Sequence, residues 1–258
     1  MFFHFRIFFH SLVFLAILNF VTSQYVSDYF AETSNWGLFF AAIVFLGIFI
    51  YFYQVAKRIA QRTSMTPMPV IFVLSTLGML YFVQSYKQQY LLIALSMIAY
   101  YFIHLALYRL RSCTTDKTAR GIIAAGSVAT IFLFYAAAYG IYFNFAIALW
   151  ILMIILMPIT TLISFQYFWL INDNKKNVLN YSLVLGFAMT EIVWVLNFWP
   201  FGYLTTGVIT LIFYYVFWDL VQCHFLHNLS KKKVIINMVL FGILLVLVLS
   251  STRWLPVV

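Results

Sequence analysis

Residues 37–53 read GLFFAAIVFLGIFIYFY, an unbroken apolar run with no charged side chain. Apolar and polar residues do not alternate in this run, whereas the strands of a transmembrane barrel alternate over about ten positions. A helix that crosses about 30 Å of hydrocarbon needs roughly 20 mostly apolar residues, and it satisfies its own backbone hydrogen bonds. The stretch therefore predicts a membrane-spanning helix.

Similar runs follow one another along nearly the whole chain. Hydrophobic residues make up 65% of the 258 residues and charged residues only 8%, whereas soluble domains carry about 25% charged residues. These features predict an all-α, polytopic transmembrane helical bundle that forms a single integral membrane domain over residues 1–258. Nine spans are expected, at about 5–22, 36–54, 69–84, 89–109, 121–139, 145–170, 178–198, 204–222 and 234–250.

Lysine and arginine are distributed unevenly between the two sides that these spans define. One side has 13 of the 15 cations and the other side has two, Lys87 and Arg253. The 13 are Arg6, Lys57, Arg58, Arg62, Arg109, Arg111, Lys117, Arg120, Lys175, Lys176, Lys231, Lys232 and Lys233. The positive-inside rule then predicts a cytosolic N-terminus and a C-terminus outside an inner or plasma membrane.

This distribution also explains the net charge of +9. A nucleic-acid partner would need a basic face on a soluble surface, so none is expected. The expected partners are the lipid bilayer and anionic headgroups on the cytosolic side; a protein partner or a homo-oligomer remains open. Residues 5–22 also resemble a signal peptide, and cleavage would leave eight helices with the same topology.

Glu191 is an acidic residue deep inside the seventh predicted span. At 100° per residue it shares a helix face with five others, and a carboxylate facing lipid is costly, so this face is expected to point into the bundle. The five are Asn180, Val184, Phe187, Trp194 and Phe198. Desolvation favours the neutral acid, or else requires a hydrated cavity. Glu191, with Trp194 and Asn180, is therefore a candidate proton or ligand site; a purely structural hydrogen-bonding role is the alternative.

A second group of polar residues lies near the cytosolic ends of the spans. Asp219, Cys223 and His227 recur every four residues, while His104 and His10 belong to the fourth and first spans. Aspartate, cysteine and histidine are metal-ligand types, but the usual zinc signatures are missing, so no metal or other cofactor is expected. The first three residues are therefore interpreted as a hydrated juxtamembrane turn. The two histidines either join Asp219 in a cluster that binds a headgroup or relays protons, or they are separate interfacial histidines, each satisfied on its own.

Close helix packing is predicted in the fifth span. Gly121, Ala125 and Ala129 recur every four residues, with Gly126 beside them. Small side chains let two helices approach closely. The stripe therefore predicts a packing contact.

The pattern Glu191-x-x-Trp194-x-Leu196-x-Phe198-x-Pro200-Phe201 resembles a recurring stretch of uncharacterised bacterial multi-pass membrane proteins. The resemblance covers about a dozen residues and implies no activity. The sequence has no phosphate-binding loop, no nucleophile elbow and no zinc-protease motif. Catalysis is therefore not favoured, and no catalytic residue is assigned.

Three functional classes remain open. The first is a small transporter or proton-linked permeation protein in which Glu191 titrates. The second is a structural or assembly subunit of a membrane complex. The third, least favoured, is a lipid-modifying membrane enzyme that uses the neighbourhood of His104 and Asp219.

Overall fold

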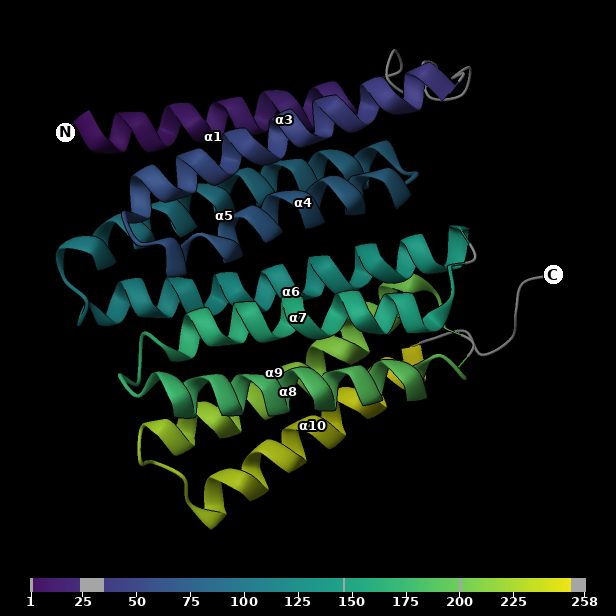
Figure 1. Cartoon of the computed structure of the whole chain (residues 1–258). Helices are drawn as coiled ribbons and strands as arrows, with labels where there is room; N and C mark the ends of the chain where they lie inside the picture. Colours follow the sequence, from purple (N-terminus) through teal and green to yellow (C-terminus); the bar gives the residue numbers. More distant parts are fainter. Residues whose placement is uncertain (1, 24–34, 146, 200, 252–258) are drawn as a thin grey trace. The chain divides into compact units, whose positions relative to one another are not determined.

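The computed structural model describes residues 2–23, 35–145, 147–199 and 201–251, and every regular element in this part of the chain is a helix (Figure 1). The helices are α1 (Phe2–Val21), α3 (Asn35–Ala60), a short 3₁₀ turn η1 (Thr63–Met65), α4 (Pro67–Phe82), α5 (Tyr86–Ser112), α6 (Lys117–Phe145), α7 (Leu149–Phe168), α8 (Lys175–Leu196), α9 (Tyr203–Phe225) and α10 (Lys231–Ser251).

Nine of the described helices are long and apolar enough to cross a membrane. Each coincides with one predicted span, and no end differs by more than six residues. The all-helical prediction is confirmed. The longer helices α3, α5 and α6 extend past the predicted spans into their basic flanks, because helical hydrogen bonding continues where the apolar run ends.

Local sequence explains where several helices begin. Pro67 and Pro69 occupy the first turn of α4, where the missing N–H of proline breaks no intrahelical hydrogen bond. The Asn174 side chain caps α8 by accepting a hydrogen bond from the Asn177 amide at 3.3 Å. Both devices satisfy or avoid the free N–H groups of a helix start.

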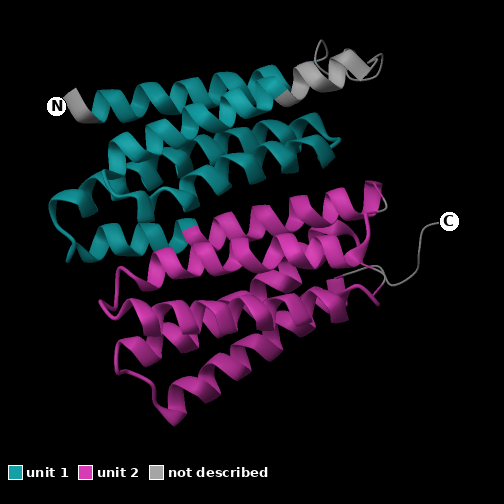
Figure 2. Cartoon of the chain, in the orientation of Figure 1, with its two compact units in different colours: residues 1–126 teal, residues 127–258 magenta. Residues whose placement is uncertain are grey.

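The chain divides into two compact units, residues 1–126 and 127–258 (Figure 2). In unit 1, α1 packs against α5, and α3 packs against α4 and α5. Three buried rings join three of these helices: the Phe14 ring lies 5.6 Å from the Phe52 ring and 4.7 Å from the Tyr100 ring. An aromatic core therefore holds α1, α3 and α5 together.

Unit 2 is held by close backbone approaches and by hydroxyl hydrogen bonds. A Cβ at Gly186 of α8 would collide with the Thr161 hydroxyl of α7, and one at Gly207 of α9 would lie 3.0 Å from the Cβ of Ala136. Buried hydroxyl pairs also cross between helices, Tyr135 with Thr160 at 2.8 Å and Ser164 with Tyr214 at 3.1 Å. Helix α10 packs against α9 and has no buried residue of its own.

The close contact of α6 is made by Gly126 and not by the predicted stripe. A Cβ at Gly126 would collide with Met68 and lie 2.9 Å from Ile103, so this glycine lets α6 approach α4 and α5. Gly121 has open space around it, and Ala125 is exposed. Helix α6 therefore packs through the face that carries Gly126 and not through the neighbouring face that carries Gly121 and Ala125. The predicted face was wrong because small side chains occur on both faces of this helix.

Cations gather at one end of each unit. In unit 1 they occupy the start of α1, the last turns of α3 and α5, and the start of α6. In unit 2 they occupy the starts of α8 and α10. Helices that follow one another in the sequence run in opposite directions within each unit, so these helix ends lie on the same side of their unit (Figure 1).

Candidate functional sites

Glu191 lies on an exposed face of α8. The face predicted from the helical period is real, and Asn180, Glu191 and Trp194 all belong to it, but it points away from the packed interior of unit 2. Phe187 and Trp194, which flank Glu191 on this face, are 57% and 50% exposed. The expectation that this face points into the bundle is therefore wrong.

The shape of the opposite face of α8 explains why the face with Glu191 points outward. Val178, Leu185, Met189 and Val193 are buried there, and Gly186 lies against Met157 and Thr161 of α7. Both faces of α8 are rich in apolar side chains, so apolarity alone does not choose between them. Small residues that admit a neighbouring backbone decide which face packs.

Glu191 has no polar partner among the residues that the structure describes. No side chain in the described part of the chain forms an ion pair or a hydrogen bond with its carboxylate. It lies about 24 Å along α8 from Lys175 and about 8 Å from Leu196 at 1.5 Å per residue. Because Cα–Cβ bonds tilt toward the start of a helix, the side chain leans away from the nearer end of α8.

Asp219 has one partner on the neighbouring helix α10 and one on its own helix. The Asn237 side-chain amide of α10 donates to the Asp219 carboxylate at 2.6 Å, and the Cys223 thiol lies 3.8 Å from the same oxygen. Lys233, also of α10, places its ammonium 3.9 Å from the Cys223 sulfur. These side chains come together because α9 packs against α10. The spacing of residues within α9 alone does not predict this contact.

His227 does not continue the face of Asp219 and Cys223. Helix α9 ends at Phe225, and His227 adopts a positive φ of 54° in the following turn. No three histidine, cysteine, aspartate or glutamate side chains in the described ranges come close enough to hold a metal ion. This region is therefore a polar contact between two helices.

His104 is buried in unit 1, and His10 is half-buried in the same unit. Nδ1 of His10 lies 2.8 Å from the Tyr51 hydroxyl, and Nδ1 of His104 lies 2.9 Å from the carbonyl oxygen of Tyr100. The Phe52 ring links the two pairs, because it lies 5.2 Å from the Tyr51 ring and 5.8 Å from the Tyr100 ring. The structure thus brings these two predicted residues into one region, together with Tyr51 and Tyr100.

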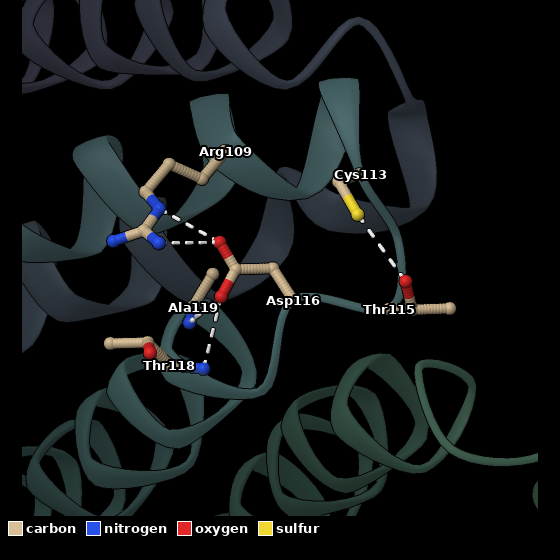
Figure 3. Close-up of polar contacts among 6 residues, drawn as sticks. All are labelled: Arg109, Cys113, Thr115, Asp116, Thr118 and Ala119. Atoms are coloured by element: carbon tan, nitrogen blue, oxygen red, sulfur yellow. Dashed lines mark hydrogen bonds and ion pairs between the residues drawn. The ribbon is translucent and has the colours of Figure 1, made fainter.

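The loop between α5 and α6 carries the one ion pair among the described residues (Figure 3). Nη2 of Arg109 lies 2.7 Å and Nε 2.8 Å from one Asp116 oxygen, while the other oxygen accepts from the amides of Thr118 and Ala119 at 3.0 and 3.2 Å. The Ala119 amide and the Arg109 guanidinium hold the pKa of the Asp116 carboxyl below its usual value.

Cys113 is an exposed thiol in the same loop, 3.3 Å from the Thr115 hydroxyl (Figure 3). Hydrogen bonding with Thr115 lowers the pKa of this thiol. The other cysteine, Cys223, is buried. Only Cys113 therefore offers both exposure and a favoured thiolate, which is the reactive form of cysteine.

A family model matches residues 54–251, from the last turns of α3 through α10, and its description is a protein of unknown function, DUF5656. The chain belongs to this family. The DUF5656 match contains His104, Glu191 and Asp219, whereas His10 precedes it. No curated protein and no solved structure matches the chain.

The candidate residues of this DUF5656 chain are divided between its two units. His10 and His104 lie in unit 1, whereas Glu191 and Asp219 lie in unit 2. Within unit 2 Glu191 lies about 8 Å from Leu196, where α8 ends, and Asp219 lies about 9 Å from Phe225, where α9 ends. Because α8 and α9 are antiparallel neighbours, these two helix ends lie on opposite sides of the unit. They do not form a carboxylate pair.

Proposed function

We propose that the chain is a multi-pass protein of the inner or plasma membrane, with its N-terminus in the cytosol and its C-terminus outside. Nine described helices of sufficient length and apolarity support the insertion. The gathering of cations at one end of each unit supports the orientation, because the basic ends of membrane helices stay on the cytosolic side. The cytosolic ends are then the start of α8 and the end of α9.

In this orientation the Glu191 carboxylate occupies the outer part of the hydrocarbon layer, on a surface made of large apolar side chains. Phe187 and Trp194 flank it. The side chain leans toward the membrane centre, which lengthens its path to the outer headgroups. Intramembrane acids that face lipid are costly and rare, and they are usually paired.

We therefore propose that the protein is an assembly subunit whose α8 docks a transmembrane helix of a different protein. The orientation of Glu191 carries this proposal. The complementary partner has a lysine or arginine in the outer half of its span, which turns an unpaired acid into a desolvated ion pair. A second copy of this chain is a poorer match, because every described cation lies near a helix end, including Lys87 in the first turn of α5.

The permeation hypothesis remains a prediction, and Glu191 no longer supports it. A pathway through the interior of unit 2 would need the carboxylate on the packed side of α8, where Gly186 and Val193 lie instead. The enzyme hypothesis also remains a prediction, and Asp219 gives it little support because its carboxylate already accepts a hydrogen bond from the Asn237 amide at 2.6 Å. The contacts of Glu191 and Asp219 therefore favour assembly over transport and catalysis.

A photo-crosslinking side chain at Phe187, one turn from Glu191, tests the assembly proposal. The matched control places the same group at Leu162, an exposed position on α7. We expect the Phe187 probe to capture a different membrane protein and the Leu162 probe to capture lipid. Glu191→Gln keeps the size of the side chain but removes its charge, so it should abolish the protein crosslink.

The identity of the captured protein completes the test. It should carry a lysine or arginine in the outer half of a span, and exchanging the two charges between the proteins should restore the crosslink. Capture of lipid alone, or of a second copy of this chain, would contradict the proposal. Full capture by the Glu191→Gln variant would contradict it as well.

A further inference from the structure

Tyr100 and His104 form a buried polar pair on α5 that has no complete set of partners. They lie one turn apart, with ring centroids 4.0 Å from each other, and each is only 1% exposed. Within the described part of the chain, neither the Tyr100 hydroxyl nor Nε2 of His104 has a hydrogen-bond partner. Two polar atoms on neighbouring side chains are thus withdrawn from solvent, an arrangement that is costly unless something satisfies both.

The hydrogen bond at the other ring nitrogen fixes what His104 can accept. Nδ1 lies 2.9 Å from the carbonyl oxygen of Tyr100. A carbonyl oxygen only accepts hydrogen bonds, so Nδ1 carries the proton of the neutral ring. Nε2 then presents a lone pair, while the Tyr100 hydroxyl presents a hydrogen.

Neighbouring helices enclose this pair without satisfying it. The Phe14 ring of α1 and the Phe52 ring of α3 pack 4.7 and 5.8 Å from the Tyr100 ring. Phenylalanine offers no hydrogen-bonding atom. Polar side chains on these helices are already engaged: His10 and Tyr51 are joined to each other at 2.8 Å, and the Ser11 hydroxyl donates to the Ile7 carbonyl oxygen at 3.0 Å.

We propose that Tyr100 and His104 bind one small hydroxyl group inside unit 1. A hydroxyl is complementary to both orphan atoms, because it donates its hydrogen to Nε2 of His104 and accepts one from the Tyr100 phenol. A carbonyl cannot donate to Nε2, and a cation cannot accept from the phenol. The hydroxyl belongs either to an ordered water molecule or to the glycerol of a lipid such as diacylglycerol; both have the same hydrogen-bonding chemistry.

The conservative variant Tyr100→Phe tests the proposal through the sign of its effect on thermal unfolding in detergent. If a hydroxyl is bound, the variant loses a hydrogen bond and strands the ligand, so the melting temperature falls. If the site is empty, the variant removes an unsatisfied buried hydroxyl, and the melting temperature stays the same or rises. Either of the latter results overturns the proposal.

Two further measurements sharpen this test. Tyr135→Phe removes a buried hydroxyl whose partner is Thr160 at 2.8 Å, and it calibrates the loss expected for a satisfied phenol. The double variant Tyr100→Phe with His104→Leu should lose less than the sum of the two single variants, because either change already releases the ligand. Strict additivity would contradict a shared ligand.

Delipidation separates the two sources of the hydroxyl. With bound water, the loss caused by Tyr100→Phe persists after exhaustive removal of lipid, and a high-resolution density map shows an isolated peak near both atoms. With a lipid hydroxyl, the difference between the two proteins disappears on delipidation and returns when diacylglycerol is added. A Tyr100→Phe loss that follows neither pattern, with no density at the site, would count against a bound hydroxyl.

Discussion

Replacing Glu191 by leucine should leave the stability of the isolated folded chain unchanged and should improve the insertion of α8 into the membrane. The carboxylate touches no partner in the described part of the chain and lies on the exposed side of α8. Exposed substitutions that break no contact usually change stability by less than about 0.5 kcal/mol. We therefore expect the free energy of unfolding of the isolated Glu191→Leu chain to match that of the wild type.

Insertion of α8 into the membrane should improve in the same variant. On insertion scales an ionised side chain at the centre of a helix costs about 2.5–3.5 kcal/mol, whereas leucine contributes about −0.3 to −0.6 kcal/mol. Glu191 lies about 8 Å from the end of α8, away from its centre, so the penalty is smaller there. The expected gain in insertion free energy is about 1–3 kcal/mol.

Two assays read these effects separately. Steric trapping in bicelles measures unfolding of the isolated chain, and a glycosylation-based insertion assay measures α8 alone. Asp219→Leu is the matched control, because it strands the Asn237 amide that donates to Asp219 at 2.6 Å; it should destabilise the folded chain by about 1–3 kcal/mol. A comparable loss in Glu191→Leu would show that Glu191 is buried, and would refute the outward orientation.

Two further predictions concern packing and the α5–α6 loop. Gly186→Leu should lower the free energy of unfolding by about 1–3 kcal/mol, because even a Cβ there collides with the Thr161 hydroxyl. Gly242→Ala is the control, because this glycine has open space around it; it should have little effect when both variants are compared by thermal unfolding. An equal loss of stability in the two variants would contradict the close packing at Gly186. The pKa of Asp116 is lower in the folded chain than its usual 3.8, so the stability it contributes is present above pH 3.8 and disappears as the pH falls through the folded pKa. The difference in melting temperature between the wild type and Asp116→Asn should therefore narrow between pH 6 and pH 3; a difference independent of pH would contradict this role.

The helices could be predicted from the sequence because their signal is local. An apolar run of sufficient length has one way to satisfy its backbone in lipid, and all nine predicted spans coincide with helices in the described part of the chain. Pro67 and Pro69 marked the start of α4 for an equally local reason.

The orientation of the helix faces could not be predicted in the same way. Helix α8 is apolar on nearly every side, so the rule that an acid avoids lipid was the only guide, and it pointed to the wrong face. The fit of Gly186 against α7 decided the rotation. The same difficulty affected α6, where Gly126 packs and Ala125 does not.

The contacts of the candidate residues depend on how the helices pack, and the sequence does not show this packing. Asn237 and Lys233 reach Asp219 and Cys223 only because α10 packs against α9. The Tyr100 carbonyl satisfies one nitrogen of His104 and leaves the other free. Sequence spacing identified the polar residues, but only the packing shows which of them meet.

The side of the membrane near which Glu191 lies, and with it the half of the partner's span that must carry the cation, depends on which helix ends face the cytosol. The native thiol of Cys113 reports this directly, because it is exposed in the α5–α6 loop while Cys223 is buried. A membrane-impermeant maleimide should leave Cys113 unlabelled in intact cells and label it in inside-out vesicles. Lys87→Cys in a Cys113→Ser background should show the reverse. Labelling of Cys113 from outside intact cells would contradict the account.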